Sequence, residues 1–165
     1  MTIDLIPIKK EEKHSLEAQL YAYFQEIDTT KIVAKNGKST INYLYLDSYW
    51  SEDKRTPFFI LANGSSVGFV LVNDWTVEKS FDADFSIAEF YIQPTFRRKG
   101  IGNAAAHQLF DTFKGRWEVR QTISNVTAIQ FWRTIIGTYT QGEYLEISRK
   151  VGKLTQRIQL FTSQK

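Results

Sequence analysis

A strand, a glycine loop and a helix follow one another near the middle of the chain, and this unit constrains the fold most. Phe85–Gln93 (FSIAEFYIQ) has the apolar character of a strand and is followed by Pro94, which interrupts strands. Gly100 and Gly102 then precede an alanine-rich helix that we expect over Asn103–Lys114. The first N–H groups of a helix have no partners within it, and together with the helix dipole they attract anions. The unit therefore predicts an α/β fold with an anion site where the helix begins.

Three cationic residues, Arg97, Arg98 and Lys99, stand immediately before these glycines. Glycine lacks the Cβ that would keep a bulky anion from the backbone, and the cations supply further donors for phosphate oxygens. A pyrophosphate is the natural ligand of such a loop. The spacing matches neither the P-loop pattern nor the dinucleotide fingerprint GxGxxG. Taken alone, the loop is equally compatible with a solvated basic turn in which the glycines serve geometry only.

The rest of the chain alternates strand and helix patterns, with no internal repeat or linker. The expected elements are a strand over Thr2–Ile8, a helix over His14–Ile27, a partly helical aromatic segment over Ser39–Trp50, a hairpin with strands Phe58–Ala62 and Val67–Val72 around an Asn63-Gly64 turn, a strand over Trp117–Thr122, a helix starting at Asn125, and strands near Tyr139–Ile147 and Leu154–Phe161. This order predicts a mixed α/β sheet with helices on its faces.

Composition excludes several classes of protein and site. The chain has 165 residues, 42% of them hydrophobic, which suits one folded domain and not a disordered chain. It has no cysteine and only two histidines, far apart at His14 and His107, so we expect neither disulfides nor a metal site. No apolar run is long enough for a signal peptide or a membrane span, so we expect a cytoplasmic protein with no membrane partner. The net charge of +3 is too small to indicate nucleic acid.

Two motifs resemble those of the GNAT superfamily of N-acetyltransferases. Arg97–Gly102 (RRKGIG) is similar to the family's acetyl-CoA signature Q/R-x-x-G-x-G/A, and Asn125–Trp132 (NVTAIQFW) to its N-x-x-A-x-x-F/L-Y helix. The order of elements from Thr2 to Phe161 also resembles the GNAT fold, so the likeness covers nearly the whole chain. It implies a single acetyltransferase domain over residues 1–165, with a mixed central sheet of about six to seven strands and helices on both faces. It further implies acetyl-CoA as co-substrate and no metal.

The resemblance also assigns the cofactor contacts. In this family the CoA pyrophosphate rests on backbone amides of the signature loop, and the pantetheine arm lies along the preceding strand. The following strand diverges and opens a slot for the thioester. A backbone N–H near Tyr91 or Ile92 would then polarise the thioester carbonyl. The residues implied to bind the cofactor are Phe90, Tyr91, Ile92, Arg97, Arg98, Lys99, Gly100, Ile101, Gly102, Asn103 and Asn125.

The implied reaction is direct attack of a primary amine on the thioester within a ternary complex. An alkyl amine has a pKa of about 10.4, so a base must take its proton near neutral pH. Glu89 is the candidate base, and the alternative is a carboxylate that faces solvent or pairs with a lysine. The family often has a tyrosine, the proton donor to the leaving thiolate, where this chain has Trp132. We expect Trp132 to pack in the core and Tyr139 to donate the proton, with Tyr144 or solvent as alternatives.

The acceptor is expected to be an amine of a small molecule, a peptide or a protein. Aromatic and acidic residues crowd the segment that borders the acceptor pocket in this family, and they suit a cationic amine, although an aromatic stripe of this kind more often belongs to the core. These residues are Tyr43, Tyr45, Tyr49, Trp50, Asp47 and Glu52.

Two other functions stay open at this level. The Trp132 substitution supports a GNAT-fold module that binds acyl-CoA as a sensor or scaffold without catalysis. The basic loop gives only thin support for a nucleic-acid-binding protein. The sequence does not decide between a monomer and a homodimer.

Overall fold

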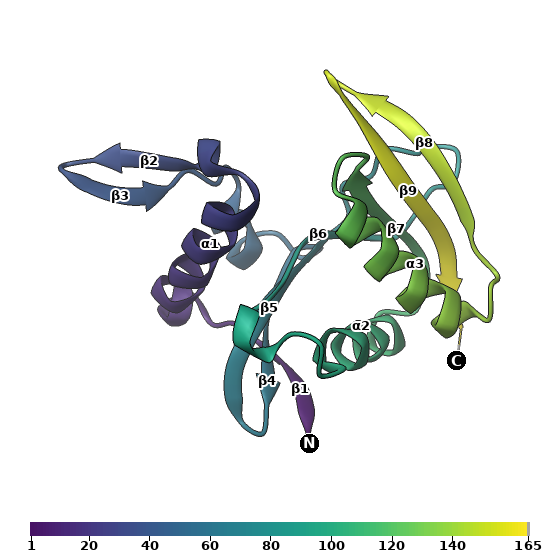
Figure 1. Ribbon diagram of the computed structural model, residues 1–165, viewed down its shortest axis with the longest axis horizontal. Helices are drawn as coiled ribbons and strands as arrows, with labels where there is room; N and C mark the ends of the chain where they lie inside the picture. Colours follow the sequence, from purple (N-terminus) through teal and green to yellow (C-terminus); the bar gives the residue numbers. More distant parts are fainter. Residues whose placement is uncertain (165) are drawn as a thin grey trace.

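A mixed sheet of seven strands forms the centre of the molecule (Figure 1). The structure is a computed structural model that describes residues 1–164. The strands lie in the order β1-β4-β5-β6-β7-β9-β8, and every neighbouring pair is antiparallel except β6–β7. Their bounds are β1 Ile3–Pro7, β4 Thr56–Ala62, β5 Ser65–Asn73, β6 Phe85–Ile92, β7 Gly115–Thr122, β8 Leu145–Val151 and β9 Leu154–Ser163. The sheet expected from the sequence is confirmed.

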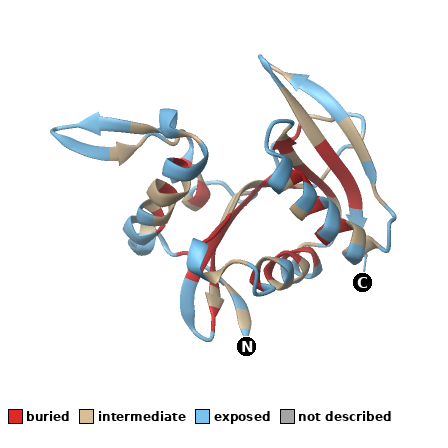
Figure 2. Ribbon diagram, in the orientation of Figure 1, coloured by how far each residue is buried: buried red, intermediate tan, exposed pale blue. Residues whose placement is uncertain are grey.

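Three α-helices cover the two faces of this sheet (Figure 1). The helix α1 (Lys13–Ile27) packs on one face, because Leu16, Leu20 and Phe24 recur every four residues and are buried together. The helices α2 (Ile101–Thr112) and α3 (Val126–Thr140) pack on the other face, in a separate core. Figure 2 shows that the buried parts of these helices turn toward the sheet. Among residues 1–164, no helix has the length and apolar character needed to cross a membrane.

The aromatic segment Ser39–Trp50 is helical in part, as the sequence predicted, but it begins in a hairpin that the sequence analysis does not anticipate. Its first residues belong to a separate hairpin of β2 (Ile32–Lys35) and β3 (Lys38–Ile41), and a 3-10 helix, η3, covers Leu46–Trp50. The reason is the Asn-Gly pair at 36 and 37, where both φ angles are positive (53° and 73°), as a tight hairpin turn requires. The hairpin projects beyond α1 and is mostly exposed (Figures 1 and 2). The Asn63-Gly64 turn between β4 and β5 is confirmed.

The strand predicted near Tyr139–Ile147 begins later than expected. The helix α3 continues to Thr140, because Ile135, Ile136 and Tyr139 extend its apolar face. The helix ends at Gln141, whose φ of 55° is left-handed, and β8 starts only at Leu145. Three further 3-10 helices, η1 (Lys10–Glu12), η2 (Thr29–Lys31) and η4 (Pro94–Phe96), connect the main elements.

The strands β6 and β7 diverge soon after they meet. Their parallel pairing spans only three residue pairs, from Phe85 opposite Trp117 to Ile87 opposite Val119. Beyond Val119, β7 remains paired with β9 on its other edge up to Thr122. On its other edge β6 pairs with β5, and the register of this pairing shifts at Ala88. The strand β6 therefore carries a β-bulge where the divergence begins. The divergence predicted for this strand pair is confirmed, and it opens the sheet between its two faces.

Candidate active site

The amino end of α2 has the geometry of an anion site. Gly100 is the N-cap residue, with φ of 79°, and no side chain caps the helix there. Two residues earlier, Arg98 is also left-handed, with φ of 63°. Left-handed residues at alternate positions turn successive N–H groups toward one point. The uncapped N–H groups of the first turn of α2 lie next to them in the chain. The residues from Arg98 to Asn103 therefore offer several backbone donors to one anion.

The three cations of the loop differ in what their side chains do. Each nitrogen of the Arg97 guanidinium has a partner, because the group donates to both carboxylate oxygens of Glu26 on α1 (2.5 and 2.7 Å) and to the Ile92 carbonyl (2.8 Å). Arg98 and Lys99 are exposed, and within the described residues neither forms a salt bridge. Of the three cations, Arg98 and Lys99 are therefore the ones without a carboxylate partner among residues 1–164, while Arg97 joins the loop to α1.

Gly102 lies where α2 approaches α3 closely. A Cβ at this position would meet the Phe131 ring at 3.0 Å and the Phe90 ring at 3.7 Å. Asn125 lies at the N-cap of α3, as predicted, and its carboxamide accepts from the Ala128 N–H (3.1 Å). The loop, the end of β6 and the start of α3 are thereby brought together from distant parts of the sequence.

The free edge of β6 presents backbone groups to the space between β6 and β7. The Gln93 N–H donates to the Val67 carbonyl (2.8 Å), so Gln93 faces β5. Because this direction alternates along an antiparallel strand, the Tyr91 N–H also faces β5, whereas those of Phe90 and Ile92 face the opening. The sequence analysis expects the N–H group of Tyr91 or Ile92 to polarise the thioester carbonyl. Of these two N–H groups, the one that faces the opening is that of Ile92.

Glu89 lies on the α1 side of this opening. The bulge turns both Ala88 and Glu89 to the α1 face, and the Tyr23 hydroxyl on α1 donates to the Glu89 carboxylate (2.7 Å). Burial raises the pKa of Glu89 to about 7, although hydrogen bonds from Tyr23 and Tyr43 and the positive charge of Lys31 partly oppose this rise. A carboxyl group with such a pKa can exchange protons near neutral pH. The sequence leaves two alternatives for Glu89, a catalytic base or a carboxylate that faces solvent or pairs with a lysine. The second alternative does not describe this environment.

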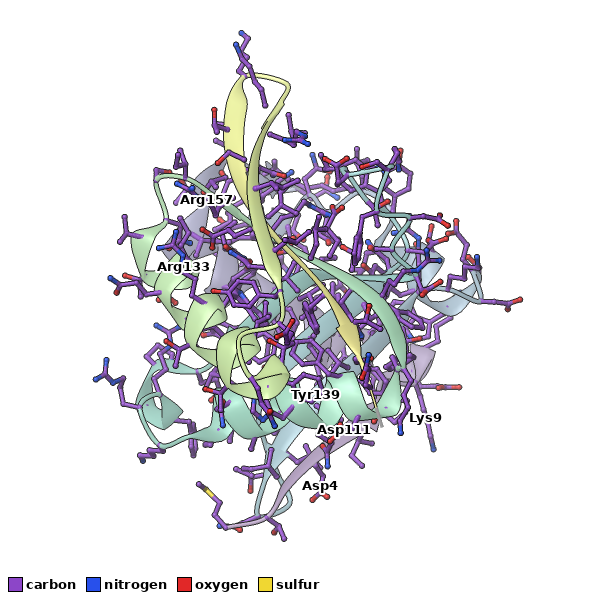
Figure 3. The ribbon with its side chains drawn as sticks, turned by 90° about the vertical axis from the view of Figure 1, so that its right-hand side faces the viewer. Asp4, Lys9, Asp111, Arg133, Tyr139 and Arg157 are labelled. Atoms are coloured by element: carbon purple, nitrogen blue, oxygen red, sulfur yellow. The ribbon has the colours of Figure 1, made fainter. Side chains whose placement is uncertain are left out.

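Trp132, at the position of the family's tyrosine, and Tyr139, the expected proton donor, both lie on the α2–α3 face. Trp132 is 6% exposed and packs edge-on against Phe90 (ring centroids 5.1 Å apart), as expected for a core residue. The Tyr139 hydroxyl donates to Asp111 on α2 (2.8 Å), and Figure 3 shows the two side chains together. Its ring packs against Phe110. The structure therefore does not bring Tyr139 together with Glu89.

The aromatic and acidic residues of the 43–52 segment divide into two groups. Tyr43 and Tyr49 turn inward, and the Asn73 amide donates to the Tyr49 hydroxyl (3.4 Å). The two carboxylates turn outward into ion pairs, Asp47 with Lys13 (2.7 Å) and Glu52 with Arg55 (2.7 Å). A cavity of about 520 Å³ lies along Tyr43 and Asp47, between α1 and η3. The larger cavity, of about 680 Å³, lies at the closed end of the β6–β7 pair, lined by Asp84 and Lys114.

Sequence reasoning missed two residues that border Glu89. Tyr23 falls on the apolar stripe of α1, a position typical of the core, yet its hydroxyl contacts the carboxylate. Arg120 lies two residues after Glu118, so the two charged side chains project from the same face of a strand. Two charges on one face of a buried strand are the sequence signal that could have identified Arg120. Within the described residues, no cluster of three histidine, aspartate or glutamate side chains could hold a metal ion.

Comparisons with known proteins agree with this architecture. A model of the Acetyltransferase (GNAT) family matches residues 18–137. No curated protein matches the sequence. A crystal structure of an acetyltransferase from Thermus thermophilus has a TM-score of 0.68 at 17% identity, covering 98% of this chain and 97% of that one.

Two other solved structures show the same fold. The ribosomal-protein-S18-alanine N-acetyltransferase from Escherichia coli has a TM-score of 0.63 at 12% identity, covering 99% of this chain and 96% of that one. A putative acetyltransferase from Salmonella typhimurium, solved with its cofactor acetyl-CoA, has a TM-score of 0.62 at 12% identity, covering 100% of this chain and 96% of that one. At these identities the likeness is one of fold.

Proposed function

The chain belongs to the GNAT family of acetyltransferases, and from this premise we propose that it transfers an acetyl group from acetyl-CoA to a primary amine. One observation carries the proposal. The sheet opens between β6 and β7, with the anion-binding end of α2 on one face and Glu89 on the other. A cofactor held on the first face could thus present its acyl group to an acceptor on the second. We further propose that residues 1–165 act as a single acetyltransferase domain.

The α2 loop fits the diphosphate of CoA. Its uncapped N–H groups and the left-handed Arg98 and Gly100 form a concave set of donors, and the exposed Arg98 and Lys99 add positive charge. The free N–H groups of Phe90 and Ile92 would pair with the pantetheine arm along β6. Acetyl-CoA, when bound, supplies the acetyl group as a thioester that an amine nitrogen attacks, with CoA leaving as a thiol.

Glu89 would take the proton of the acceptor amine. Its pKa of about 7 leaves a large share of the side chain ionised at neutral pH, and the same value lets it release the proton to solvent afterwards. Tyr23 holds the carboxylate in place through its 2.7 Å hydrogen bond. Because Tyr139 is hydrogen-bonded to Asp111 near the carboxyl ends of α3 and α2, away from the loop at the amino end of α2, we propose that the thiolate takes its proton from solvent.

A non-catalytic module that binds acyl-CoA is the second candidate, and the buried Trp132 is the observation that favours it. Its indole cannot act as an acid, and it fills the position where the family often has a tyrosine. The carboxyl group of Glu89, placed at the opening, favours catalysis instead. An acceptor amine is also the reported substrate type of the E. coli relative, which acts on an alanine.

Two measurements test the proposed function. Titration calorimetry with acetyl-CoA measures binding, and thiol release against a panel of small amines, amino acids and peptides measures transfer. We expect micromolar binding and thiol release that depends on the amine. Binding without release across the whole panel would support the non-catalytic module. Absence of binding would contradict both candidates.

A further inference from the structure

Arg120 lies on the α1 face of β7, at the point where the two strands separate. On β7, Trp117 and Val119 belong to the α2–α3 core, so Glu118 and Arg120 project from the opposite face. Val119 opposite Ile87 is the last pair between β6 and β7, and Arg120 is therefore the first residue beyond it. Burial raises the pKa of Glu89, and the positive charge of Arg120 is one of the influences that partly oppose this rise, which is consistent with this proximity.

The Arg120 guanidinium is held by only one of its three nitrogens. Nη1 lies within hydrogen-bonding distance of the Trp75 carbonyl (3.2 Å), Ser86 Oγ (3.2 Å) and the carboxylate of Glu118 (2.6 Å). The Trp75 ring covers the guanidinium at 4.7 Å, and the Arg120 side chain is 11% exposed. Nε and Nη2 have no hydrogen-bond partner among residues 1–164, and neither belongs to the fully buried atoms that lack one, so each keeps some contact with solvent.

An open guanidinium edge of this kind is suited to an anion. Nε and Nη2 are parallel donors, matched in spacing to two oxygens of a carboxylate or a phosphate. Arg120 is also fixed in position by its Nη1 contacts and by Trp75, so little side-chain freedom is lost when such a group binds. Glu118 is fully buried and its carboxylate accepts the N–H groups of Val77 and Glu78, so its oxygens do not occupy the open edge.

The charges around Glu89 point in the same direction. Among the largest influences on the pKa of Glu89, the charged groups are Lys31 and Arg120, and both are cations. Both carboxylates of the 43–52 segment are paired with cations of the protein itself, Asp47 with Lys13 and Glu52 with Arg55. A polyamine would therefore meet positive charge beside the base, whereas an amine with its own anionic group would be attracted.

We propose that the acceptor is an amine that carries a carboxylate or phosphate group, and that the Nε–Nη2 edge of Arg120 binds this group. This inference rests on the proposed function, because it places the acceptor amine at Glu89. The half-exposed Trp75 ring, 50% accessible beside the guanidinium, offers an apolar surface to the rest of the acceptor. Arg120 is thus a residue that determines specificity and takes no part in proton transfer.

Matched acceptor pairs test the proposal in the wild-type protein. Phenylalanine is compared with phenethylamine, and phosphoethanolamine with ethanolamine, by thiol release from acetyl-CoA. We expect the anionic member of at least one pair to have a kcat/KM at least about tenfold higher, since a hydrogen-bonded charge pair is worth about that much or more. The pair that shows the preference identifies carboxylate or phosphate as the recognised group. Equal values within both pairs would overturn the inference and leave the proposed function standing.

Variants of Arg120 assign the preference to this side chain. For Arg120→Gln we expect kcat/KM for the anionic acceptor to fall by about 10- to 100-fold, with the value for its neutral counterpart nearly unchanged. Arg120→Lys should retain part of the preference. Arg116→Gln is the matched control, because it removes a cation from the same strand near the closed end, where Arg116 pairs with Asp82 and Asp84. An equal loss for both members of a pair would show a structural role only and would overturn the assignment.

A binding measurement keeps the test independent of turnover and of the variants. Calorimetry with the wild-type protein and CoA compares N-acetylphenylalanine with N-acetylphenethylamine, and the corresponding N-acetyl derivatives of the phosphate pair. Tighter binding of an anionic product supports the inference even if no amine is acetylated, a result that would count against the proposed function alone. Equal or undetectable binding within both pairs, together with no acceptor preference, would overturn the inference even if Arg120→Gln failed to fold.

Discussion

On the α2–α3 face, the candidate site consists of backbone amides from one continuous loop, whereas on the α1 face it consists of side chains from separate elements. The loop from Arg98 to Asn103 owes its donors to two left-handed residues and an uncapped helix end. The other site joins Tyr23 of α1, Glu89 of β6 and Arg120 of β7. A backbone site depends on conformation and space, while a side-chain site depends on each group in turn. Substitutions should therefore affect binding on the first face and rate, pH dependence or selectivity on the second.

Gly102→Glu should have the largest effect of all, the loss of cofactor binding at the α2–α3 face. The new side chain would begin 3.0 Å from the Phe131 ring and would carry negative charge to the place where a diphosphate binds. We expect CoA affinity, measured by calorimetry, to fall by at least about 100-fold. Gly137→Ala is the control, since its Cβ would make only an ordinary contact with Tyr144 at 3.7 Å. Retention of wild-type affinity in Gly102→Glu would show that the ligand lies elsewhere.

Glu89→Gln should show that the α1 face controls the rate of transfer and the α2–α3 face controls cofactor binding. The amide cannot accept a proton from the amine, so kcat should fall by about 100-fold or more, while CoA affinity stays the same. In the wild-type protein the rate should rise with pH around 7, because the ionised carboxylate is the active form. The variant should lack this rise. Glu143→Gln, on the exposed turn after α3, serves as control, and a pH profile shared by wild type and Glu89→Gln would exclude Glu89 as the base.

The same carboxyl group should make stability depend on pH. The folded protein binds its proton with a pKa of about 7, against an ordinary value of 4.5, so the folded state holds more protons between these values. Its stability must then fall as pH rises through this window, by up to about 3 kcal/mol. Glu89→Gln should remove that contribution. Urea unfolding at pH 5 and pH 8 measures it, and an equal pH dependence in both proteins would contradict the buried environment of Glu89.

Tyr23→Phe should sharpen the description of the α1 face with a smaller effect. The Tyr23 hydroxyl stabilises the ionised form of Glu89, so its removal raises the pKa of that group and leaves less base at neutral pH. We expect the rate at pH 7 to fall by roughly two- to tenfold and to recover at higher pH. CoA affinity should not change. A rate loss that is the same at every pH would indicate a packing effect.

Asn125→Ala should give the smallest effect and bears on the α2–α3 face. Its carboxamide caps α3 by accepting the Ala128 N–H, so its loss should destabilise the fold by about 1 kcal/mol. If Asn125 also contacts the cofactor, as the family resemblance implies, CoA affinity should fall a few-fold. Urea unfolding and calorimetry separate these contributions. Unchanged affinity with reduced stability would restrict Asn125 to its capping role.

Local sequence signals predicted the elements whose geometry is settled within a few residues. The Asn63-Gly64 turn, the capping by Asn125 and the glycine loop at the head of α2 all follow from backbone preferences of the residues present. A similar signal, Asn-Gly at 36 and 37, lies in the segment where the hairpin β2–β3 was missed, because the aromatic residues after it were weighed as a helix. The sequence pattern also predicts a strand near Tyr139, where α3 instead continues to Thr140.

The sequence by itself indicated the family and most of the order of strands and helices, and it predicted an anion site at the loop, since these depend on short-range preferences and on continuous motifs. Tertiary structure alone decided that Tyr23 meets Glu89, that Arg97 is occupied by Glu26, and that Arg120 keeps one edge free. The reason is physical. The direction of a side chain and the polarity around it depend on which distant elements pack against it. The bulge at Ala88 and the three-residue pairing of β6 with β7 likewise have no recognisable pattern in the local sequence.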